Sequence, residues 1–475
     1  MIPNKIQTPD RVETRIGTLE FNDGFPTADT SQRLFDQLDF SRAVEVFLQC
    51  VPAASLEAMR LGMADIGVDA CHKLAIADDL LDSDPLFLTG NTDTVYVSGI
   101  IDLERDGPTV VEIPPGCGPG TVNDAWFRFV IDMGRPGPDR GEGGTYLVVP
   151  VGYDGPVPDG AFVAESPSNI NWLILRGLLV DGAPDGAAAA MRDGVRVYPL
   201  ANADDPPPPQ FMSMSGRRFN TIHANNFEFY NELAAVVERE RLEVIDPETR
   251  GLLAAIGIRK GTPFAPDARM KAILEDAASV ANGTARAIAF TTRDRGAFLF
   301  PDRAWKTAFI GGDYQWLIAN GAGGRNLDAR TMFFYLATVN TPAMALEMPG
   351  VGSQYALADH DCRGDYLDGG CSYELTLPPG VPAADFWSIV VYDPQTRSEL
   401  QTGQRFPSRN SQRDDLTYNS DGSITLSFGP SEPMTNPGNW IQTISDKRWF
   451  VILRLYGPLG PWFDRTWVPG DISPA

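Results

Sequence analysis

A cluster of polar residues at the start of an apolar strand is the first feature of this sequence that could carry chemistry. Asn91 and Asp93 precede a β-branched run that contains Tyr96. An amide and a carboxylate can hold a ligand hydroxyl, and the Tyr96 ring offers a stacking face and a phenol. Asp93 and Tyr96 are candidate catalytic residues, with Asp93 as a general base, and Asn91 is a candidate ligand-binding residue. The competing interpretation is a turn closed by bonds to backbone amides, which is the commoner use of Asn and Asp.

Arg330 is a second candidate, because it follows Asp328 at a predicted helix start beside aromatic residues that include Tyr335. Its guanidinium group can clamp a ligand carboxylate. A buried Arg–Asp contact between domains explains the same pattern, so both interpretations stay open. We name Arg330 and Tyr335 as candidate ligand-binding residues.

Large aromatic residues form a third pattern. Trp126 and Trp387 can line a groove for a carbohydrate or an apolar ligand, and sandwich cores use such residues as buried anchors equally well. We name both as candidate ligand-binding residues. The resulting hypothesis is one internal cavity that residues 91–96 share with Arg330 and Trp387.

The sequence offers little for a metal ion or a cofactor, and we expect neither. Its histidines are isolated and lack the HExxH, HxH and Cys/His spacings of zinc and iron sites: His72, His223 and His360. Carboxylates gather between glycines in the loop 359–370, which suits Ca²⁺ but lacks EF-hand spacing. Cys362 and Cys371 flank a tight loop and could bridge if oxidised, whereas reduced thiols are typical of cytoplasmic proteins.

Composition and charge restrict the partners. The chain has 475 residues and a formal net charge of −23. Such an acidic surface repels nucleic acid and anionic lipid, so we expect neither as a partner. The first 23 residues lack the apolar core of a signal peptide, and no run reaches the length of a membrane span. We therefore expect a cytoplasmic protein without a membrane anchor, and a homo-oligomer stays open.

Hydrophobic periodicity divides the chain into segments with helical patterns and segments with strand patterns. A helical pattern covers residues 31–81, interrupted at Pro52. From residue 86 the texture is that of a β-sandwich, with β-branched and aromatic runs between Pro/Gly turns. The predicted strands of this region are 94–101, 109–113, 125–132, 145–151 and 195–200.

Helices are expected again beyond the Pro run 206–209, which looks like a linker. The first is expected to begin with a capping box of Asn225 and Glu228. The second is expected from Asp267 to Asn282, with Gly283 as its C-cap. A third follows Asn326 and ends before Pro342, and strands return after residue 350, with clear examples at 424–428 and 449–456.

Several motifs along the chain resemble a bacterial family that combines two domains of unknown function. The segments that resemble domain of unknown function 1254 are 91–96, 143–147 and 195–200. Those that resemble domain of unknown function 1214 are 386–393 (FWSIVVYD), 419–423, 439–440 and 454–456. The connecting segment matches as well, at 256–264 and 327–342, so the resemblance covers nearly the whole chain.

This resemblance implies an α+β multidomain fold without implying a reaction. It implies an N-terminal helical segment (1–85), an immunoglobulin-like β-sandwich (86–205), a helical middle region (206–349) and a C-terminal jelly-roll β-sandwich (350–475). Many relatives carry export signals, from which this chain departs.

The sequence lacks a GxSxG elbow, a P-loop and a GxGxxG that opens a βα unit, so these catalytic and nucleotide-binding classes have no support. Acid–base chemistry by carboxylates leaves no short motif and stays open. We expect a protein that binds a small organic or saccharide ligand in an interdomain cleft, or a metal-independent hydrolase or lyase that uses carboxylate and tyrosine residues. The alternative is a noncatalytic structural or protein-interaction protein built on two β-sandwiches.

Overall fold

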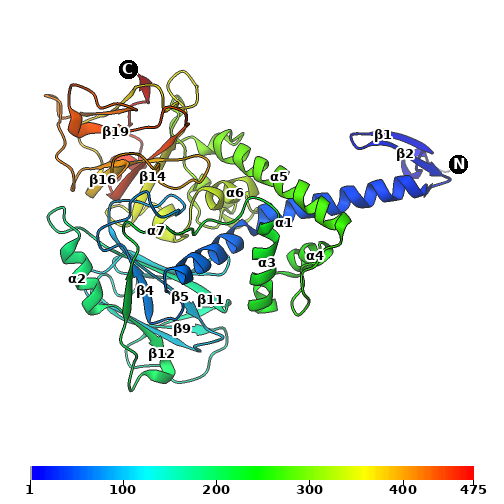
Figure 1. Ribbon diagram of the computed structural model, residues 1–475, viewed down its shortest axis with the longest axis horizontal. Coiled ribbons are helices and arrows are strands. Elements are labelled where there is room, and N and C mark those ends of the chain that lie inside the picture. The colour runs from blue at the N-terminus through cyan, green and yellow to red at the C-terminus, as the bar shows by residue number, and fades with distance from the viewer. Residues whose placement is uncertain (1–2) are drawn as a thin grey trace.

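The computed structural model describes residues 3–475 and shows a mixed α+β protein. Figure 1 shows two regions rich in β-strands, a set of helices beside them, and an N-terminal arm that projects from the body. Short 3-10 turns occur at Asn4–Ile6, Leu200–Asn202, Leu242–Val244, Arg295–Ala297, Ile310–Gly312, Ala319–Gly321 and Pro437–Asn439.

The arm is a small antiparallel sheet at the outer end of a long helix (Figure 1). Its strands are β1 (Arg11–Thr14), β2 (Gly17–Asn22) and β3 (Phe25–Pro26), and the helix is α1 (Ala28–Asp65). The expected interruption at Pro52 was wrong, since α1 continues through this residue. Proline removes one backbone donor but has a φ that suits a helix. The fully buried flanks, which include Val51 and Ala53, hold the helix together on both sides.

The first β-rich region contains two facing sheets with a buried core between them. The six-stranded sheet has the order β13 (Gln210–Ser213), β4 (Lys73–Ile76), β5 (Val95–Asp102), β11 (Ile170–Gly177), β7 (Gly120–Asp124) and β8 (Phe129–Met133). The four-stranded sheet has the order β10 (Phe162–Ser166), β9 (Gly144–Pro150), β6 (Thr109–Ile113) and β12 (Arg196–Pro199). Helix α2 (Asp185–Gly194) contacts β5, β6 and β11. Because helices cover its second face, the six-stranded sheet has central strands that are buried throughout.

The covering helices are α1, α3 (Glu228–Arg239), α4 (Pro247–Ala255), α5 (Ala268–Phe290), α6 (Leu327–Leu336) and α7 (Pro342–Ala345). Asp267 and Asn326 cap α5 and α6 with their side chains. The expected capping box was wrong, because α3 has Phe227 at its N-cap without a side-chain bond. The expected end of α5 at Gly283 was also wrong. Buried alanines, including Ala281 and Ala285, pack on both sides of this glycine and carry the helix through it.

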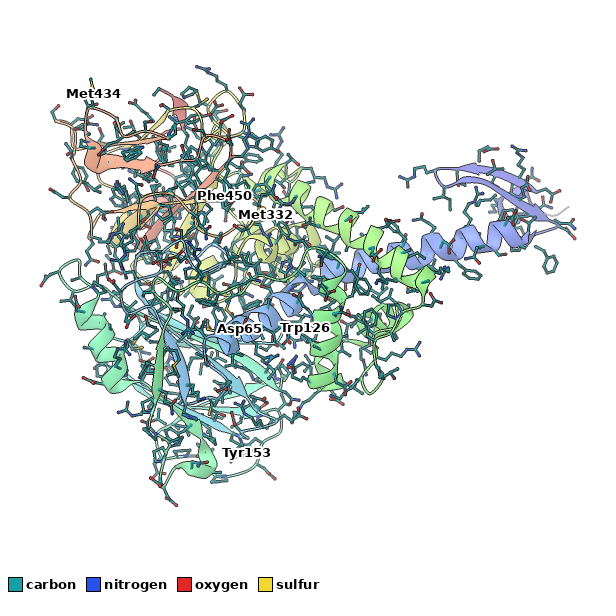
Figure 2. The ribbon with its side chains drawn as sticks, viewed as in Figure 1. Asp65, Trp126, Tyr153, Met332, Met434 and Phe450 are labelled. Atoms are coloured by element: carbon teal, nitrogen blue, oxygen red, sulfur yellow. The ribbon has the colours of Figure 1, made fainter. Side chains whose placement is uncertain are left out.

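The second β-rich region also pairs two sheets over an apolar core. One has the order β14 (Ser353–Ala358), β20 (Phe450–Pro458), β16 (Ala383–Tyr392) and β17 (Ser408–Asn410). The other has the order β19 (Trp440–Gln442), β18 (Ile424–Gly429), β15 (Tyr373–Leu377) and β21 (Ser473–Pro474), and α8 (Gly460–Phe463) follows β20. Helix α6 packs on the first of these sheets, where Met332 and Phe450 belong to one buried cluster (Figure 2). The helices therefore contact both β-rich regions.

Candidate functional site

The polar cluster at residues 91–94 lies buried in the segment that leads into β5. The Asn91 Oδ1 atom accepts the backbone N–H of Asp93 at 3.0 Å, which is the geometry of a side-chain turn. The Asn91 amide also donates a hydrogen bond to the Tyr96 hydroxyl. Asn91 therefore shapes the turn and at the same time orients the phenol of Tyr96.

Asp93 is fully buried and joins the first β-rich region to the second. Its carboxylate accepts hydrogen bonds from the hydroxyl of Ser388 in β16, the amide of Asn410 at 3.1 Å and the hydroxyl of Tyr456 at 3.0 Å. A buried carboxylate is tolerated when such donors satisfy it. The bonding partners of Asp93 thus all lie in the second region, from three different strands.

The backbone just before this cluster is held by Arg454 of β20. The Arg454 guanidinium donates to the carbonyls of Thr89 at 2.6 Å and Gly90 at 3.1 Å, and to the Tyr392 hydroxyl at 2.5 Å. Arg454 is 4% exposed, and its Nε atom has no hydrogen-bond partner in the described residues. No carboxylate pairs with it among residues 3–475. The arginine is therefore held in place by carbonyl and hydroxyl oxygens, without an ion pair in the described residues.

Beside this cluster lies a cavity of about 80 Å³ at the junction of the two β-rich regions and the helices. Its polar wall is formed by Tyr96, Arg176, Tyr355, Lys306 and Arg454. Its apolar wall is formed by side chains that include Phe87, Leu88, Ile174, Phe309, Phe333, Leu336, Val339, Met344, Leu357 and Ile452. The cavity is therefore amphipathic, with cationic groups as its charged side chains.

Arg176 is the most unusual of these residues, because it is the charged member of the fully buried strand β11, which apart from Asn171 is otherwise apolar. It is 8% exposed, and within residues 3–475 it forms no ion pair and no hydrogen bond of good geometry. Its polar neighbours are phenols. The guanidinium carbon lies 5.6 Å from the centre of the Tyr96 ring, and the Tyr355 hydroxyl lies close without a hydrogen-bond partner.

The lysine and the phenols of the cavity have different roles from the arginines. Lys306 is neutralised by Asp359 at 2.6 Å, so it adds no free charge. Burial raises the pKa of Tyr96, although Arg176 and Arg454 act in the opposite direction. The phenol is therefore protonated at neutral pH and can donate a hydrogen bond into the cavity.

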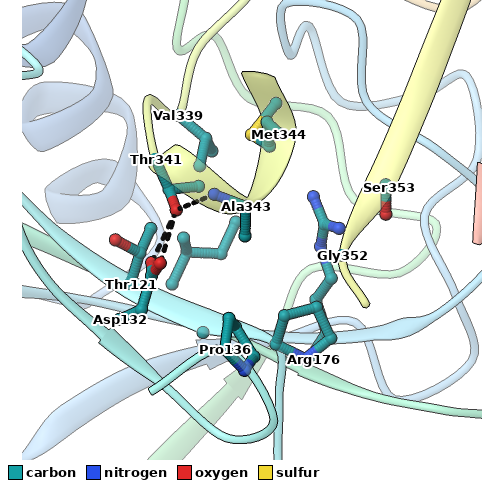
Figure 3. Close-up of a pocket in the computed structure, with 13 residues that line it drawn as sticks. Thr121, Asp132, Pro136, Arg176, Val339, Thr341, Ala343, Met344, Gly352 and Ser353 are labelled. Atoms are coloured by element: carbon teal, nitrogen blue, oxygen red, sulfur yellow. Dashed lines mark hydrogen bonds between the residues drawn. The ribbon is translucent and has the colours of Figure 1, made fainter. Parts of the chain in front are cut away.

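A smaller pocket adjoins this cavity and shares Ile174, Arg176, Val339 and Met344 with it. Figure 3 shows the Arg176 side chain extending toward Gly352 and Ser353, opposite Asp132. The Asp132 carboxylate accepts the Thr341 hydroxyl at 2.7 Å, and burial raises the pKa of Asp132 to about 6. A carboxylate that titrates near neutrality thus lies in the same pocket as the unpaired arginine.

Two family models match the sequence around this junction. Residues 72–199 match a model described as a protein of unknown function (DUF1254), and residues 352–460 match one described as a protein of unknown function (DUF1214). The chain therefore contains both of these domains of unknown function, in this order. The resemblance noted from the sequence motifs is confirmed, and the cavity lies where the DUF1254 region, the helices and the DUF1214 region meet.

Comparison with solved structures supports the fold alone. The VPA0106 protein from Vibrio parahaemolyticus aligns with a TM-score of 0.57 at 15% identity, over 92% of this chain and 100% of that one. A putative uncharacterized protein from Burkholderia cenocepacia aligns with a TM-score of 0.42 at 11% identity, over 94% of this chain and 97% of that one. No curated protein matches the sequence. Across residues 3–475, no helix is long and apolar enough to cross a membrane.

We call the cavity of about 80 Å³ the DUF1254–DUF1214 junction cavity. Of the residues that the sequence suggested for a site, only some reach it in the structure. Of the predicted cluster, Tyr96 lines this cavity, while Asn91 and Asp93 lie buried behind it. Trp387 lies in the apolar core of the second β-rich region. Alternate residues of β16 face opposite sides of the sheet, and its neighbour Ser388 faces Asp93.

The other candidates lie on different sides of the helical layer. Trp126 and Arg330 line a separate cavity beside α4 and α6. Asp328, which the sequence suggested as the partner of Arg330, instead pairs with Arg293 at 2.9 Å. The Tyr335 hydroxyl donates to Asn282 at 2.7 Å, and Arg397 lies over the Tyr335 ring. The single shared cavity of the sequence hypothesis is therefore replaced by two cavities, because successive residues of α6 point to different sides of the helix.

The residues that the sequence reasoning missed are Arg176, Arg454 and Tyr355. The available signal was a charged residue inside a buried apolar strand: Arg176 ends the run INWLILR, and Arg454 interrupts FVILRLY. A cation at such a position needs a partner, so it marks either an ion pair or a site.

The candidate metal ligands are occupied by other contacts. Within the described part of the chain, no group of His, Cys, Asp and Glu side chains could hold a metal ion. In the acidic loop, Asp359 contacts Lys306 and His360, and Asp361 accepts backbone N–H groups of its own turn. Cys362 and Cys371 are both free and exposed.

Proposed function

We propose that this protein binds a compact organic anion, with its negative head on Arg176 and its apolar body in the DUF1254–DUF1214 junction cavity. The observation that carries the proposal is the pair of buried arginines, Arg176 and Arg454, that line one cavity without a carboxylate partner in the described residues. An unpaired charge is costly to bury, because the protein interior solvates it poorly. A carboxylate ligand would supply the missing charge and accept hydrogen bonds in a fork geometry.

The volume and the apolar wall of the cavity limit the size and the polarity of the ligand's body. A cavity of about 80 Å³ holds roughly five to eight waters when each needs about 10–15 Å³. That space fits a short aliphatic or single-ring body, and its burial against side chains such as Phe333 and Leu357 favours binding. We therefore place the ligand among short carboxylic acids.

The same lining makes a saccharide the weaker of the two ligand classes expected from the sequence. Sugars need several neutral donors and acceptors for their hydroxyl groups. The neutral polar side chains of the wall are Tyr96, Tyr355, Thr89 and Thr338, whereas most other lining groups are apolar. An organic anion matches both the charge and the apolarity of the wall.

A second candidate function is a metal-independent lyase or hydrolase reaction on the same ligand. Asp132 favours it, since this carboxylate lies in the adjoining pocket that also contains Arg176. With a pKa of about 6 it is ionised at neutral pH and can accept a proton from a ligand there. Asp93 is not part of this proposal, because its carboxylate already accepts hydrogen bonds from the second β-rich region.

Calorimetry with short carboxylates tests the binding proposal. We expect butyrate, hexanoate or benzoate to bind, and the corresponding amides, which match them in shape without the charge, to bind at least about tenfold more weakly. Arg176→Gln should abolish the difference, while Arg363→Gln, at an exposed loop position, should preserve it. Equal binding of acids and amides, or binding that persists in Arg176→Gln, would refute the proposal. Absence of any binding would favour the noncatalytic structural alternative.

The finer structural assignments also remain proposals. We propose that the first pair of sheets is immunoglobulin-like and the second a jelly roll, with a domain limit near residue 350. The first pair extends beyond the limits at 86 and 206 expected from the sequence, because β4 and β13 belong to its six-stranded sheet. The paired sheets around separate apolar cores support this division. An experimental structure with a different strand topology would contradict it. Cell fractionation tests the predicted cytoplasmic location, and light scattering shows whether the protein forms a homo-oligomer.

A further inference from the structure

A second cavity, of about 340 Å³, lies between the β7–β8 turn, α4 and α6. Its charged wall contains Arg128, Arg325 and Arg330 but one carboxylate, Asp246. The whole chain has the opposite balance, with 62 acidic and 39 basic side chains. Three guanidinium groups around one cavity therefore stand out against the average surface of this protein.

Two of these arginines have no acidic partner. Arg128 forms an ion pair with Asp124. Arg325 donates to the carbonyl of Gln315 at 2.9 Å, and Arg330 donates to the carbonyl of Gln49. Among residues 3–475, neither Arg325 nor Arg330 forms an ion pair with a carboxylate. The backbone carbonyls hold both guanidinium groups in position, while Asp313 acts on Arg325 and Glu45 acts on Arg330 without forming an ion pair.

The pKa values of the two groups support this picture. Partial burial lowers the pKa of Arg325; the charge of Asp313 opposes this shift, and the charge of Arg128 adds to it. Burial likewise lowers the pKa of Arg330, to which the charge of Arg325 also contributes. Mutual repulsion of this kind is relieved when an anion binds between the groups.

The remaining wall offers a neutral polar group and aromatic surfaces. Asn340 is 4% exposed, and its Oδ1 atom has no hydrogen-bond partner in the described residues. Trp126, Tyr314 and Trp316 also line the cavity. Aromatic rings of this kind pack against a flat organic body, and an unpaired amide oxygen can accept a hydrogen bond from it.

We propose that this second cavity binds a phosphate monoester that carries an aromatic ring, with the phosphoryl group on Arg325 and Arg330 and the ring against the aromatic wall. Guanidinium groups bind phosphate through paired, charge-assisted hydrogen bonds. A phosphate monoester carries close to two negative charges near neutrality, which matches two arginines that form no ion pair in the described residues. The site is separate from the Arg176 cavity, so this inference does not rest on the proposed carboxylate ligand.

Titration calorimetry with phenyl phosphate is the test, with inorganic phosphate and phenol as partial ligands. We expect phenyl phosphate to bind more tightly than either. Arg325→Gln should weaken it at least about tenfold, since one charge-assisted contact is lost. Arg325 is exposed, so this variant is expected to fold, whereas Arg330→Gln also removes a bond to the α1 backbone. Arg15→Gln, an exposed change on the N-terminal arm, is the matched control and should bind as the wild type does.

Each other outcome contradicts the inference. Equal affinity for phenyl phosphate and inorganic phosphate would refute the aromatic component. Unchanged affinity in Arg325→Gln, or no binding by the wild type at millimolar ligand, would refute the site. Loss of phenyl phosphate binding in Arg176→Gln would assign the ligand to the other cavity and overturn this proposal, while leaving the Arg176 proposal intact.

Discussion

Arg176 can be tested through the stability of the ligand-free protein, by comparing Arg176→Met with Arg454→Met. The two arginines line the same cavity, and both are almost fully buried. They differ in their contacts: Arg454 bonds the carbonyls of Thr89 and Gly90, whereas Arg176 has phenols as neighbours and no ion pair in the described residues. If Arg176 serves a ligand and Arg454 serves the structure, substitution by Met should change the free energy of unfolding in opposite directions at the two positions.

The expected magnitudes follow from these contacts. Replacing a buried ion pair with apolar side chains of similar volume is often neutral or stabilises a protein by about 1–4 kcal/mol, and a buried charge without a partner costs at least as much to keep. Loss of the contact with the Tyr96 ring offsets about 0.5–2 kcal/mol of that gain. We therefore expect Arg176→Met to raise the free energy of unfolding by about 1–2 kcal/mol. Arg454→Met leaves two carbonyls and the Tyr392 hydroxyl without a donor and should lower it by about 3–5 kcal/mol.

Urea unfolding, followed by tryptophan fluorescence and circular dichroism in ligand-free protein, measures both changes. Arg363→Gln, at an exposed site, is the control and should lie within about 0.5 kcal/mol of the wild type. A bound carboxylate at 100 times its Kd should then stabilise the wild type by about 2.7 kcal/mol and leave Arg176→Met unchanged. If Arg176→Met is destabilised as strongly as Arg454→Met, Arg176 is a structural residue and the reasoning fails.

Three further outcomes are expected. Asp93→Asn should lower the free energy of unfolding by about 1–3 kcal/mol, because the new amide presents a donor to the donors Ser388, Asn410 or Tyr456. Calorimetry should show unchanged carboxylate affinity. A sharp fall in affinity with normal stability would instead make Asp93 a ligand-binding residue. Burial raises the pKa of Asp132 to about 6, so its stabilising contribution is present at acid pH and is lost as the pH rises through about 6. Relative to Asp132→Asn, the wild type should lose about 2 kcal/mol between pH 4 and pH 7, and parallel pH profiles of unfolding would contradict this. Lys306→Met should destabilise by about 3–5 kcal/mol, since it leaves the buried Asp359 without its partner, and Asp359→Asn in the same background should recover part of that loss in thermal unfolding.

Local signals predicted those parts of the fold that depend on neighbouring residues. Asp267 and Asn326 were expected at helix starts and cap α5 and α6 in the structure, because an N-cap acts within three residues of itself. The strand expected at 109–113 has those bounds as β6. Local signals misled where long-range packing was stronger, as at Pro52 and Gly283, which buried neighbours keep within α1 and α5.

The candidate site was predicted only in part, because local signals report on neighbouring residues and not on contacts between distant segments. Residues 91–96 stand out locally, and the structure uses them as a buried connection between the two β-rich regions. Trp387 and Arg330 could not be assigned to a cavity from sequence, because the facing direction of a strand or helix residue decides which cavity it reaches. Arg176 and Arg454 were both visible as charges in apolar strands, but nothing local indicates that these strands approach one another.

The sequence by itself therefore determined the two domains of unknown function and the alternation of β-rich and helical segments. The tertiary structure alone decided that β11 of the DUF1254 region and β20 of the DUF1214 region direct Arg176 and Arg454 into one cavity. The physical reason is that a strand pattern fixes the face on which a side chain lies, within a span of a few residues. Which surfaces meet across the domain junction depends on burial summed over the whole chain, and that sum is available only in the folded protein.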